Sequence, residues 1–220
     1  MVRRSRLGPS RLGPSRLTRR VAAVGLAVAA PTVVGLVRHL RFQTGVRAGT
    51  RPPVGAATRT LPPPHEDRLS RALAGWVPAP PRGRVGRLAA ALWSSPATMF
   101  GAALGATTGG AWRRDEEHRF WLVEGGERGV ARVLRWLGFE ASAVGQVVLS
   151  RTRPISPLLA AHEAVHVRQA ERLGILLAPL YLWLWARRGY RDHPLERAAR
   201  GGAVRAEAPV VHRPPGPPRP

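Results

Sequence analysis

The sequence predicts an α+β fold in which residues 113–200 form a small folded domain of short strands, a long helix and further helices. Two short apolar runs with strand composition come before a helix whose start and stop signals are clear. The 220 residues include 24 Gly and 22 Pro, too many for a chain that is compact from end to end. An apolar content of 44% with seven Trp excludes a chain that is disordered throughout.

The composition also limits the chemistry of the protein. The chain has no Cys, which excludes disulfides, thiolate metal sites, iron–sulfur clusters and Cys nucleophiles. All 35 basic residues are Arg, the formal net charge is +22, and residues 1–60 contain no acid. Such an arm can bind nucleic acid or an anionic membrane surface, although GC-rich codon usage produces the same composition. The charge is diffuse and no nucleic-acid reader motif accompanies it, so nucleic acid is an unlikely partner.

The first two segments form the N-terminal arm. Residues 1–20 repeat Ser-Arg-Leu-Gly-Pro, and Gly-Pro every five residues predicts a disordered basic leader. Residues 21–37 carry no charge, and three alternatives are open for them: a signal-anchor helix, a cleavable signal, or a buried or irregular segment. The first two would make the protein membrane-associated or exported, whereas the third is compatible with a cytoplasmic protein.

Two further segments precede the predicted domain. Residues 38–87 are rich in Arg and Pro, show no apolar period, and are predicted to be a linker. Residues 88–112 are uncharged but diluted by Gly, Ser and Thr, with Ser95-Pro96 as an interruption. A membrane segment, a hairpin in the membrane interface and an apolar helix packed on the domain are the alternatives for this segment.

Strands and a first helix open the domain. Phe120–Glu124 is predicted as a strand ended by two Gly, and residues 143–149 are predicted as a second strand. Between them, apolar residues at 130, 133, 134 and 137 have the one-face spacing of an amphipathic helix over 127–137, with Gly138 as its stop.

Helices complete the domain. Ser156-Pro157 predicts a helix start, with Ser156 as the N-cap, and Gly174 predicts its end. An apolar run over 175–186 follows, and a last helix over 195–200 is predicted to begin after Pro194. Residues 201–220 are predicted to be a disordered tail.

The predicted helix that begins at Pro157 carries the segment His162-Glu163-Ala164-Val165-His166, an H-E-x-x-H motif. Positions i and i+4 lie on one face of a helix, so both imidazoles can reach one ion. Glu163 lies one position round the helix, close enough to contact a water on that ion without being a ligand. A catalytic zinc site needs one more protein ligand and leaves a fourth position open.

The third ligand must come from later in the chain. Glu171 is five residues beyond His166 on the same helix, so it points away, and Glu207 and His212 lie in or near the tail. The remaining cluster is 190–196, where Asp192 or His193 lies near a helix cap and Glu196 projects from the first turn.

Two imidazoles, an apolar helix and a Glu thirty residues after the second His resemble the gluzincin arrangement of zinc metallopeptidases. The segments around 162–169 and 190–198 also resemble small bacterial proteins with an H-E-x-x-H domain, and the resemblance covers about residues 139–200. It implies a zincin-like domain in which His162, His166 and Glu196 are zinc ligands and Glu163 is the general base. His193 stands where such proteins have Asn, which makes it the alternative third ligand.

The resulting hypothesis is a zinc-dependent metallopeptidase acting on a peptide or protein. The ion activates a water that attacks the peptide carbonyl, Glu163 takes its proton, and Tyr190 or His193 donates to the oxyanion. Gln169 and Arg168 are candidates for orienting the ligand imidazoles.

Two other roles remain open at this stage. The strand 143–149 is either the sheet edge on which a peptide lies or an ordinary core strand. The alternative to an enzyme is a non-catalytic, membrane-associated zinc-binding or structural protein.

Overall fold

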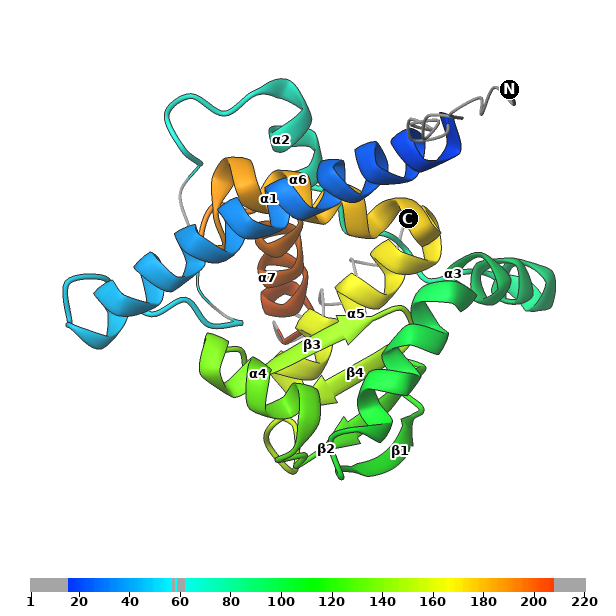
Figure 1. Ribbon diagram of the computed structural model, residues 1–220. Helices are drawn as coiled ribbons and strands as arrows, with labels where there is room; N and C mark the ends of the chain where they lie inside the picture. The colour runs from blue at the N-terminus through cyan, green and yellow to red at the C-terminus, as the bar shows by residue number, and fades with distance from the viewer. Residues whose placement is uncertain (1–15, 57, 59–61, 208–220) are drawn as a thin grey trace, which may run out of the picture.

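The structure of the protein is a computed structural model that describes residues 16–56, 58 and 62–207 (Figure 1). The fold is mixed α+β, as predicted from the sequence. Helices surround a four-stranded sheet with the strand order β1-β2-β4-β3. The elements in chain order are α1 (Arg16–Arg47), α2 (Arg68–Ala74), α3 (Gly83–Ala106), β1 (Ala111–Asp115), β2 (Phe120–Glu124), α4 (Gly129–Leu137), β3 (Ala141–Val144), β4 (Val147–Ser150), α5 (Pro157–Leu173), a 3₁₀ turn (Gly174–Leu176), α6 (Leu177–Arg188) and α7 (Pro194–Glu207).

The sheet separates two apolar layers. On one face, the fully buried side chains of Phe120, Leu122 and Val148 pack against α5. On the other face, Val123, Val147 and Leu149 pack against apolar residues of α3 and α4. Alternate residues of a strand point to opposite faces, so β2 and β4 supply both layers. The α5 helix is therefore held by the core of the domain.

The predicted strand at 120–124 and the predicted helix ended by Gly138 are confirmed. The single strand predicted at 143–149 is wrong, because the chain forms β3 and β4, an antiparallel pair joined through Gly145. Gly145 has φ +62°, and a Cβ there would meet the backbone of Thr98. A two-residue turn flanked by apolar residues reads as one continuous strand, which explains the error.

The N-terminal arm is more helical than the sequence predicted. The α1 helix begins at Arg16, so residues 16–20 are helical and not a disordered leader, whereas residues 1–15 lie outside the described part. The Gly-Pro repeat ends at Pro14, and the block on helix formation ends with it. Residues 21–37 lie inside α1. Within residues 16–207, apart from the few undescribed positions, no helix combines the length and the apolar character that crossing a bilayer requires.

The range 38–87, predicted as a linker, contains the end of α1, all of α2 and the start of α3. The α2 helix has a local cause, since the side chain of Asp67 accepts a hydrogen bond from the backbone N–H of Ser70 at 2.8 Å. An Asp N-cap satisfies a donor that the first helical turn leaves free. These parts of the predicted linker are therefore helical. The sequence did not reveal the helices because the segment has few apolar residues.

Residues 88–112 follow the alternative of an apolar helix packed on the domain. Small residues of α3 face the sheet, and Gly101 lies so close to β3 that a Cβ there would meet the carbonyl oxygen of Val144. Pro96 does not interrupt the helix. At the other end of the chain, α7 continues to Glu207, so residues 201–207 belong to a helix and not to the predicted tail, and 208–220 lie outside the described part.

Candidate metal centre

The α5 helix carries the H-E-x-x-H segment and begins and ends as predicted. The Ser156 side chain accepts a hydrogen bond from the Leu159 backbone N–H, and Pro157 occupies the first turn. Gly174 ends the helix at φ +53°, where a Cβ would lie 2.6 Å from the ring of Trp93. Because α5 is buried along most of its length, His162 and Glu163 are each only 4% exposed. The motif thus lies in the interior of the protein.

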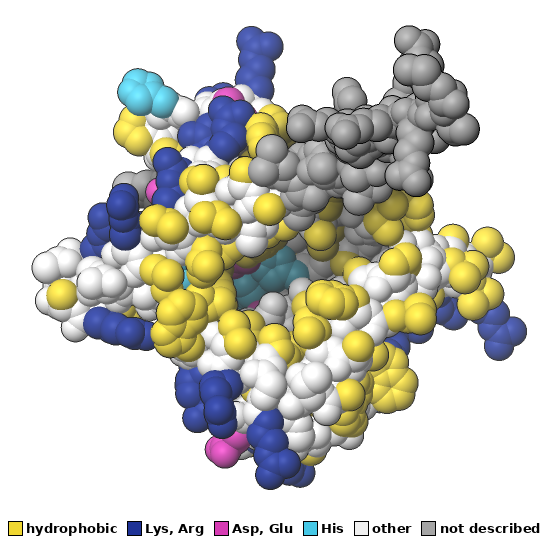
Figure 2. Space-filling model, in the orientation of Figure 1, with side chains coloured by type: hydrophobic (Ala, Val, Ile, Leu, Met, Phe, Trp, Pro, Cys, Tyr) yellow, Lys and Arg dark blue, Asp and Glu magenta, His cyan; other side chains and the backbone are white. Residues whose placement is uncertain are grey.

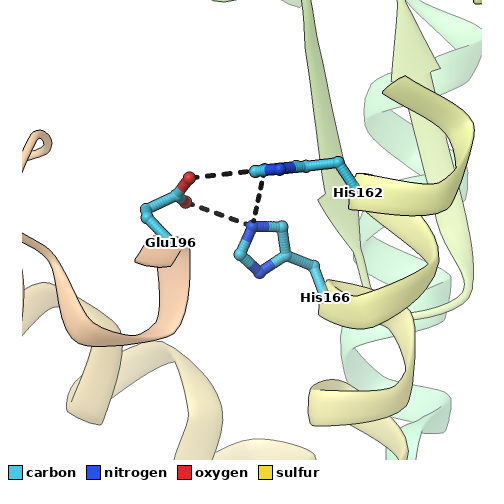
Figure 3. Close-up of side chains that lie close together, drawn as sticks. All are labelled: His162, His166 and Glu196. Carbon is cyan, nitrogen blue, oxygen red and sulfur yellow. Dashed lines mark hydrogen bonds and ion pairs between the residues drawn. The ribbon is translucent and has the colours of Figure 1, made fainter. Parts of the chain in front are cut away.

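The α7 helix brings Glu196 to the motif from the opposite side. Pro194 starts α7, Leu195 is fully buried, and α7 packs directly against α5 (Figure 1). Glu196 lies in the first turn and is 4% exposed. Figure 3 shows its carboxylate pointing across the gap between the helices toward both imidazoles.

Three ligand atoms converge in this gap. The Nε2 atoms of His162 and His166 are 3.2 Å apart. Glu196 places Oε2 3.4 Å from Nε2 of His162 and Oε1 3.2 Å from Nε2 of His166. Among the described residues, His162, His166 and Glu196 form a group with ligand atoms all within 4.8 Å of one another. This is the spacing at which three side chains can share one ion.

The hydrogen bonds around the group leave lone pairs aimed at its centre. Nδ1 of His166 lies 2.9 Å from Oε1 of Gln169, whose Nε2 faces the Leu195 carbonyl. An amide oxygen only accepts, so Nδ1 carries the proton and Nε2 of a neutral His166 presents a lone pair to the Glu196 carboxylate. Two acceptors facing each other in a buried site are unfavourable, and either a proton on Nε2 or an ion held by the three residues relieves this.

The charges of the group are coupled in the ion-free protein. Burial lowers the pKa of His166, but the facing Glu196 carboxylate outweighs burial and brings the pKa to about 9. Burial raises the pKa of Glu196, but His166 and His162 outweigh it and hold the pKa well below its usual range. A proton on His166 therefore occupies the position that an ion would take.

Tyr181 is a neighbour of the group that the sequence did not reveal. Its hydroxyl donates a hydrogen bond to Oε1 of Glu196 at 2.7 Å. Tyr181 lies on α6, in the middle of an apolar run, where an aromatic residue reads as core packing. It fixes one carboxylate oxygen while leaving lone pairs of Glu196 free for an ion.

His193, the alternative third ligand, does not join the group. Its Nε2 lies 3.1 Å from the carbonyl oxygen of Tyr181, and its ring packs on the Tyr181 ring with centroids 4.1 Å apart. Burial lowers the pKa of His193 to about 4, so the ring is neutral. The structure thus brings Glu196, and not His193, to the two histidines. His193 also does not line the cavity next to this group, which is described below and has Tyr190 in its wall.

A cavity of about 180 Å³ adjoins the group and is lined by His162, Glu163 and Tyr190. We call it the site cavity. Figure 2 shows a hollow on this face with His and acidic side chains at its base and hydrophobic side chains around its rim. Oε2 of Glu163 is buried and has no hydrogen-bond partner among the described residues. Burial raises the pKa of Glu163, against the effect of His162 and His166.

Tyr190 lies between α6 and α7, at the wall of the site cavity. Its ring contacts the rings of His39 and Phe139, with centroids 5.5 Å and 5.2 Å away. Burial, reinforced by the Glu196 carboxylate, raises the pKa of Tyr190 well above its usual value. The hydroxyl therefore keeps its proton at neutral pH and can donate a hydrogen bond.

The other candidate residues lie elsewhere. Glu171 points away from the group, as predicted, and accepts a hydrogen bond from Nε2 of Gln146 at 2.8 Å. Arg168 lies beside Glu171 at a separate pocket, so no contact supports an orienting role for it. Asp192 lines a different cavity, and Glu207 is exposed at the end of α7. His212 lies outside the described residues.

The sequence also missed one wall of the site cavity. This wall comes from residues 38–56, the C-terminal part of α1 and the segment after it, which we call the roof. Phe42, Gln43, Val46 and residues 53–56 line the cavity opposite the motif. No signal in an Arg- and Pro-rich segment connects it to residues more than a hundred positions later.

Comparison with known proteins gives no match: no family model, no curated protein and no solved structure is detectably similar to this chain.

Proposed function

We propose that this protein is a zinc-dependent metallopeptidase with a zincin-like domain. One observation carries the proposal: two imidazole nitrogens and a carboxylate converge in a buried gap, beside a buried carboxylate, that of Glu163, with an unpartnered oxygen. Two imidazoles with one carboxylate suit zinc better than magnesium or calcium, which prefer oxygen ligands alone. Three protein ligands leave room for a water or a substrate oxygen.

When bound by His162, His166 and Glu196, a zinc ion supplies a Lewis acid that lowers the pKa of a water molecule and polarises a carbonyl group. Glu163 accepts a proton from the attacking water and returns it to the leaving amine. Burial raises the pKa of Glu163, which makes its carboxylate a better proton acceptor than an exposed one. The Tyr190 hydroxyl donates a hydrogen bond to the oxyanion that develops on the carbonyl.

The strand β3 gives the peptide a place to lie. It is the last strand of the sheet order, and among the described residues it pairs only with β4, so one of its edges has no strand partner there. Glu140 and Ala141, where β3 begins, line the site cavity together with Glu163. A peptide that extends the sheet at this edge would hold its backbone beside the motif.

The test is the variant Glu163→Gln in the full chain, loaded with zinc. The amide has nearly the same shape but accepts no proton, so zinc content is unchanged while cleavage of a mixed peptide library falls about 10²–10⁴-fold. Mass spectrometry of the products measures the cleavage. Glu171→Gln, on the far side of the same helix, is the matched control and keeps the wild-type rate.

Two results would contradict the proposal. Equal cleavage by Glu163→Gln and wild type would remove Glu163 from the reaction. A wild-type protein that holds zinc but cleaves no peptide of the library would favour a non-catalytic zinc-binding protein.

A further inference from the structure

A second, larger cavity adjoins the site cavity. It has a volume of about 600 Å³, and its charged lining consists of one Asp and five Arg: Asp192, Arg38, Arg41, Arg51, Arg188 and Arg191. These residues come from α1, from the segment after α1, from the end of α6 and from the α6–α7 connection. We call this cavity the basic pocket.

The two cavities share a wall. Phe42 and Tyr190 line both the site cavity and the basic pocket. Residues 50–52 line the basic pocket, and the next residues, 53–56, line the site cavity. The two cavities are therefore neighbours, and a peptide that lies over Glu163 and follows residues 50–56 would bring its next residues to the basic pocket.

The positive charge of the basic pocket is only partly neutralised. Arg188 is ion-paired with Asp67. Arg38 donates to the carbonyl oxygens at the end of α6, at 2.6 Å, which orders its side chain but leaves its charge in place. Among the described residues, Arg41, Arg51 and Arg191 make no ion pair. One lining carboxylate, Asp192, faces this excess of guanidinium groups.

Arg51 is held at the boundary between the cavities. Its guanidinium carbon lies 6.0 Å from the centre of the Phe42 ring, a cation–π contact. Its side chain also crosses Gly45 closely, because a Cβ there would lie 2.9 Å from Cδ of Arg51. A guanidinium group positioned in this way presents two N–H donors to one carboxylate.

We propose that the basic pocket binds a carboxylate of the substrate, so that the peptides cleaved carry a negative charge close to the scissile bond. The carboxylate is either an Asp or Glu side chain or the C-terminal carboxylate of the peptide. This proposal rests on the proposed peptidase function, because it names the substrate class of the same site.

The experiment measures how the zinc-loaded full chain cleaves four peptides, arranged in two pairs whose members differ in one group. A peptide cleaved by the wild type is made with a free or an amidated C-terminus, and with Glu or Gln beside the scissile bond. We expect kcat/KM to be at least about tenfold higher for one of the two carboxylate forms, a difference of about 1.4 kcal/mol. The pair that shows the difference identifies the source of the carboxylate.

Variants connect the preference to the pocket. Arg41→Gln, Arg51→Gln and Arg191→Gln are expected to reduce the ratio of kcat/KM between the charged and neutral peptides about threefold to tenfold each. Arg132→Gln, on the exposed side of α4, removes the same charge outside both cavities and is expected to keep the wild-type ratio. Binding of the same labelled peptides to the zinc-loaded Glu163→Gln variant, measured by fluorescence anisotropy, gives a second readout that needs no turnover.

Two results would overturn the proposal while leaving the proposed function standing. The first is cleavage with equal kcat/KM for charged and neutral peptides. The second is a preference that Arg132→Gln reduces as much as the pocket variants, which would indicate a general effect of net charge. If no peptide is cleaved, the proposed function fails, and the anisotropy measurement then tests the basic pocket by itself. Tighter binding of single-stranded DNA than of a carboxylate peptide would overturn the proposal for the pocket.

Discussion

The candidate metal centre and the roof beside it are built differently. The α5 and α7 helices, which we call the floor, present buried side chains whose positions are fixed by neighbours: Gln169 holds His166, and Tyr181 holds Glu196. The roof, residues 38–56, presents exposed Arg side chains, while its buried residues His39 and Phe42 pack on the rest of the fold. The candidate metal ligands are therefore part of the core, whereas most of the Arg side chains to which we assign substrate selection lie exposed on the roof.

The roof has its own anchor. Nε2 of His39 lies 2.6 Å from the carbonyl oxygen of Leu137, and the His39 ring packs on Phe139 with centroids 4.7 Å apart. Gly35 lets α1 approach α6 so closely that a Cβ there would lie 2.6 Å from the ring of Trp185. Changes in the floor and in the roof should consequently affect different measurements.

The largest expected effect comes from the floor. Glu196→Gln removes the negative ligand and leaves two imidazoles, so zinc affinity is expected to fall more than about 100-fold, beyond what loss of an outer partner costs. Competition with a chelator measures it. Glu207→Gln, exposed on the same helix, is the control, and equal affinities of the two variants would contradict the assignment of Glu196.

The next effect concerns the contact that fixes the ligand. Tyr181→Phe removes the hydroxyl that donates to Glu196, and zinc affinity is expected to fall about 10–100-fold while the fold is kept. Trp183→Phe, on the exposed side of α6, serves for comparison. An unchanged affinity in Tyr181→Phe would mean that the carboxylate is positioned by packing alone.

Protonation of His166 should make zinc binding depend on pH. The ion must displace a proton held with a pKa of about 9, so apparent affinity is expected to fall about tenfold for each pH unit below 9. In the ion-free protein this pKa lies above the ordinary value of 6.5, so the protonated ring stabilises the fold. That contribution is complete below pH 6.5 and is lost as the pH rises through 9. Zinc titrations between pH 6 and 8 that give one affinity would contradict this coupling.

The smallest effect on the metal is expected from the part of α1 that leads into the roof. Gly35→Val forces α1 away from Trp185 and should lower the free energy of unfolding by about 1–3 kcal/mol, measured by urea denaturation. Zinc affinity should change less than about threefold. Gly86→Val, where a Cβ meets no atom within 4 Å, is the control. If Gly35→Val lowered zinc affinity as much as Glu196→Gln does, the packing of α1 and the geometry of the floor would be coupled.

The same division separates what could be predicted from the sequence. The bounds of α5 follow from Ser156 and Gly174, and the pairing of His162 with His166 follows from helical spacing. Glu196 was the ligand implied by resemblance, and only the packing of α7 on α5 separates it from His193. These features depend on local signals or on few alternatives.

The remaining features depend on contacts between distant parts of the chain. Tyr181 could not be recognised because nothing in an apolar helix tells which side faces Glu196. The roof could not be placed because its Arg and Pro composition hides the helix that ends at Arg47. The hairpin at Gly145 was missed because β3 and β4 have the same apolar character.

The central claim, that His162, His166 and Glu196 hold one zinc ion, is tested most directly by the metal content of the purified full-length protein. Elemental analysis should find about one zinc per chain in the wild type and in Arg132→Gln, and none above background in His162→Ala. A wild type without zinc, or His162→Ala with one zinc per chain, would contradict the claim.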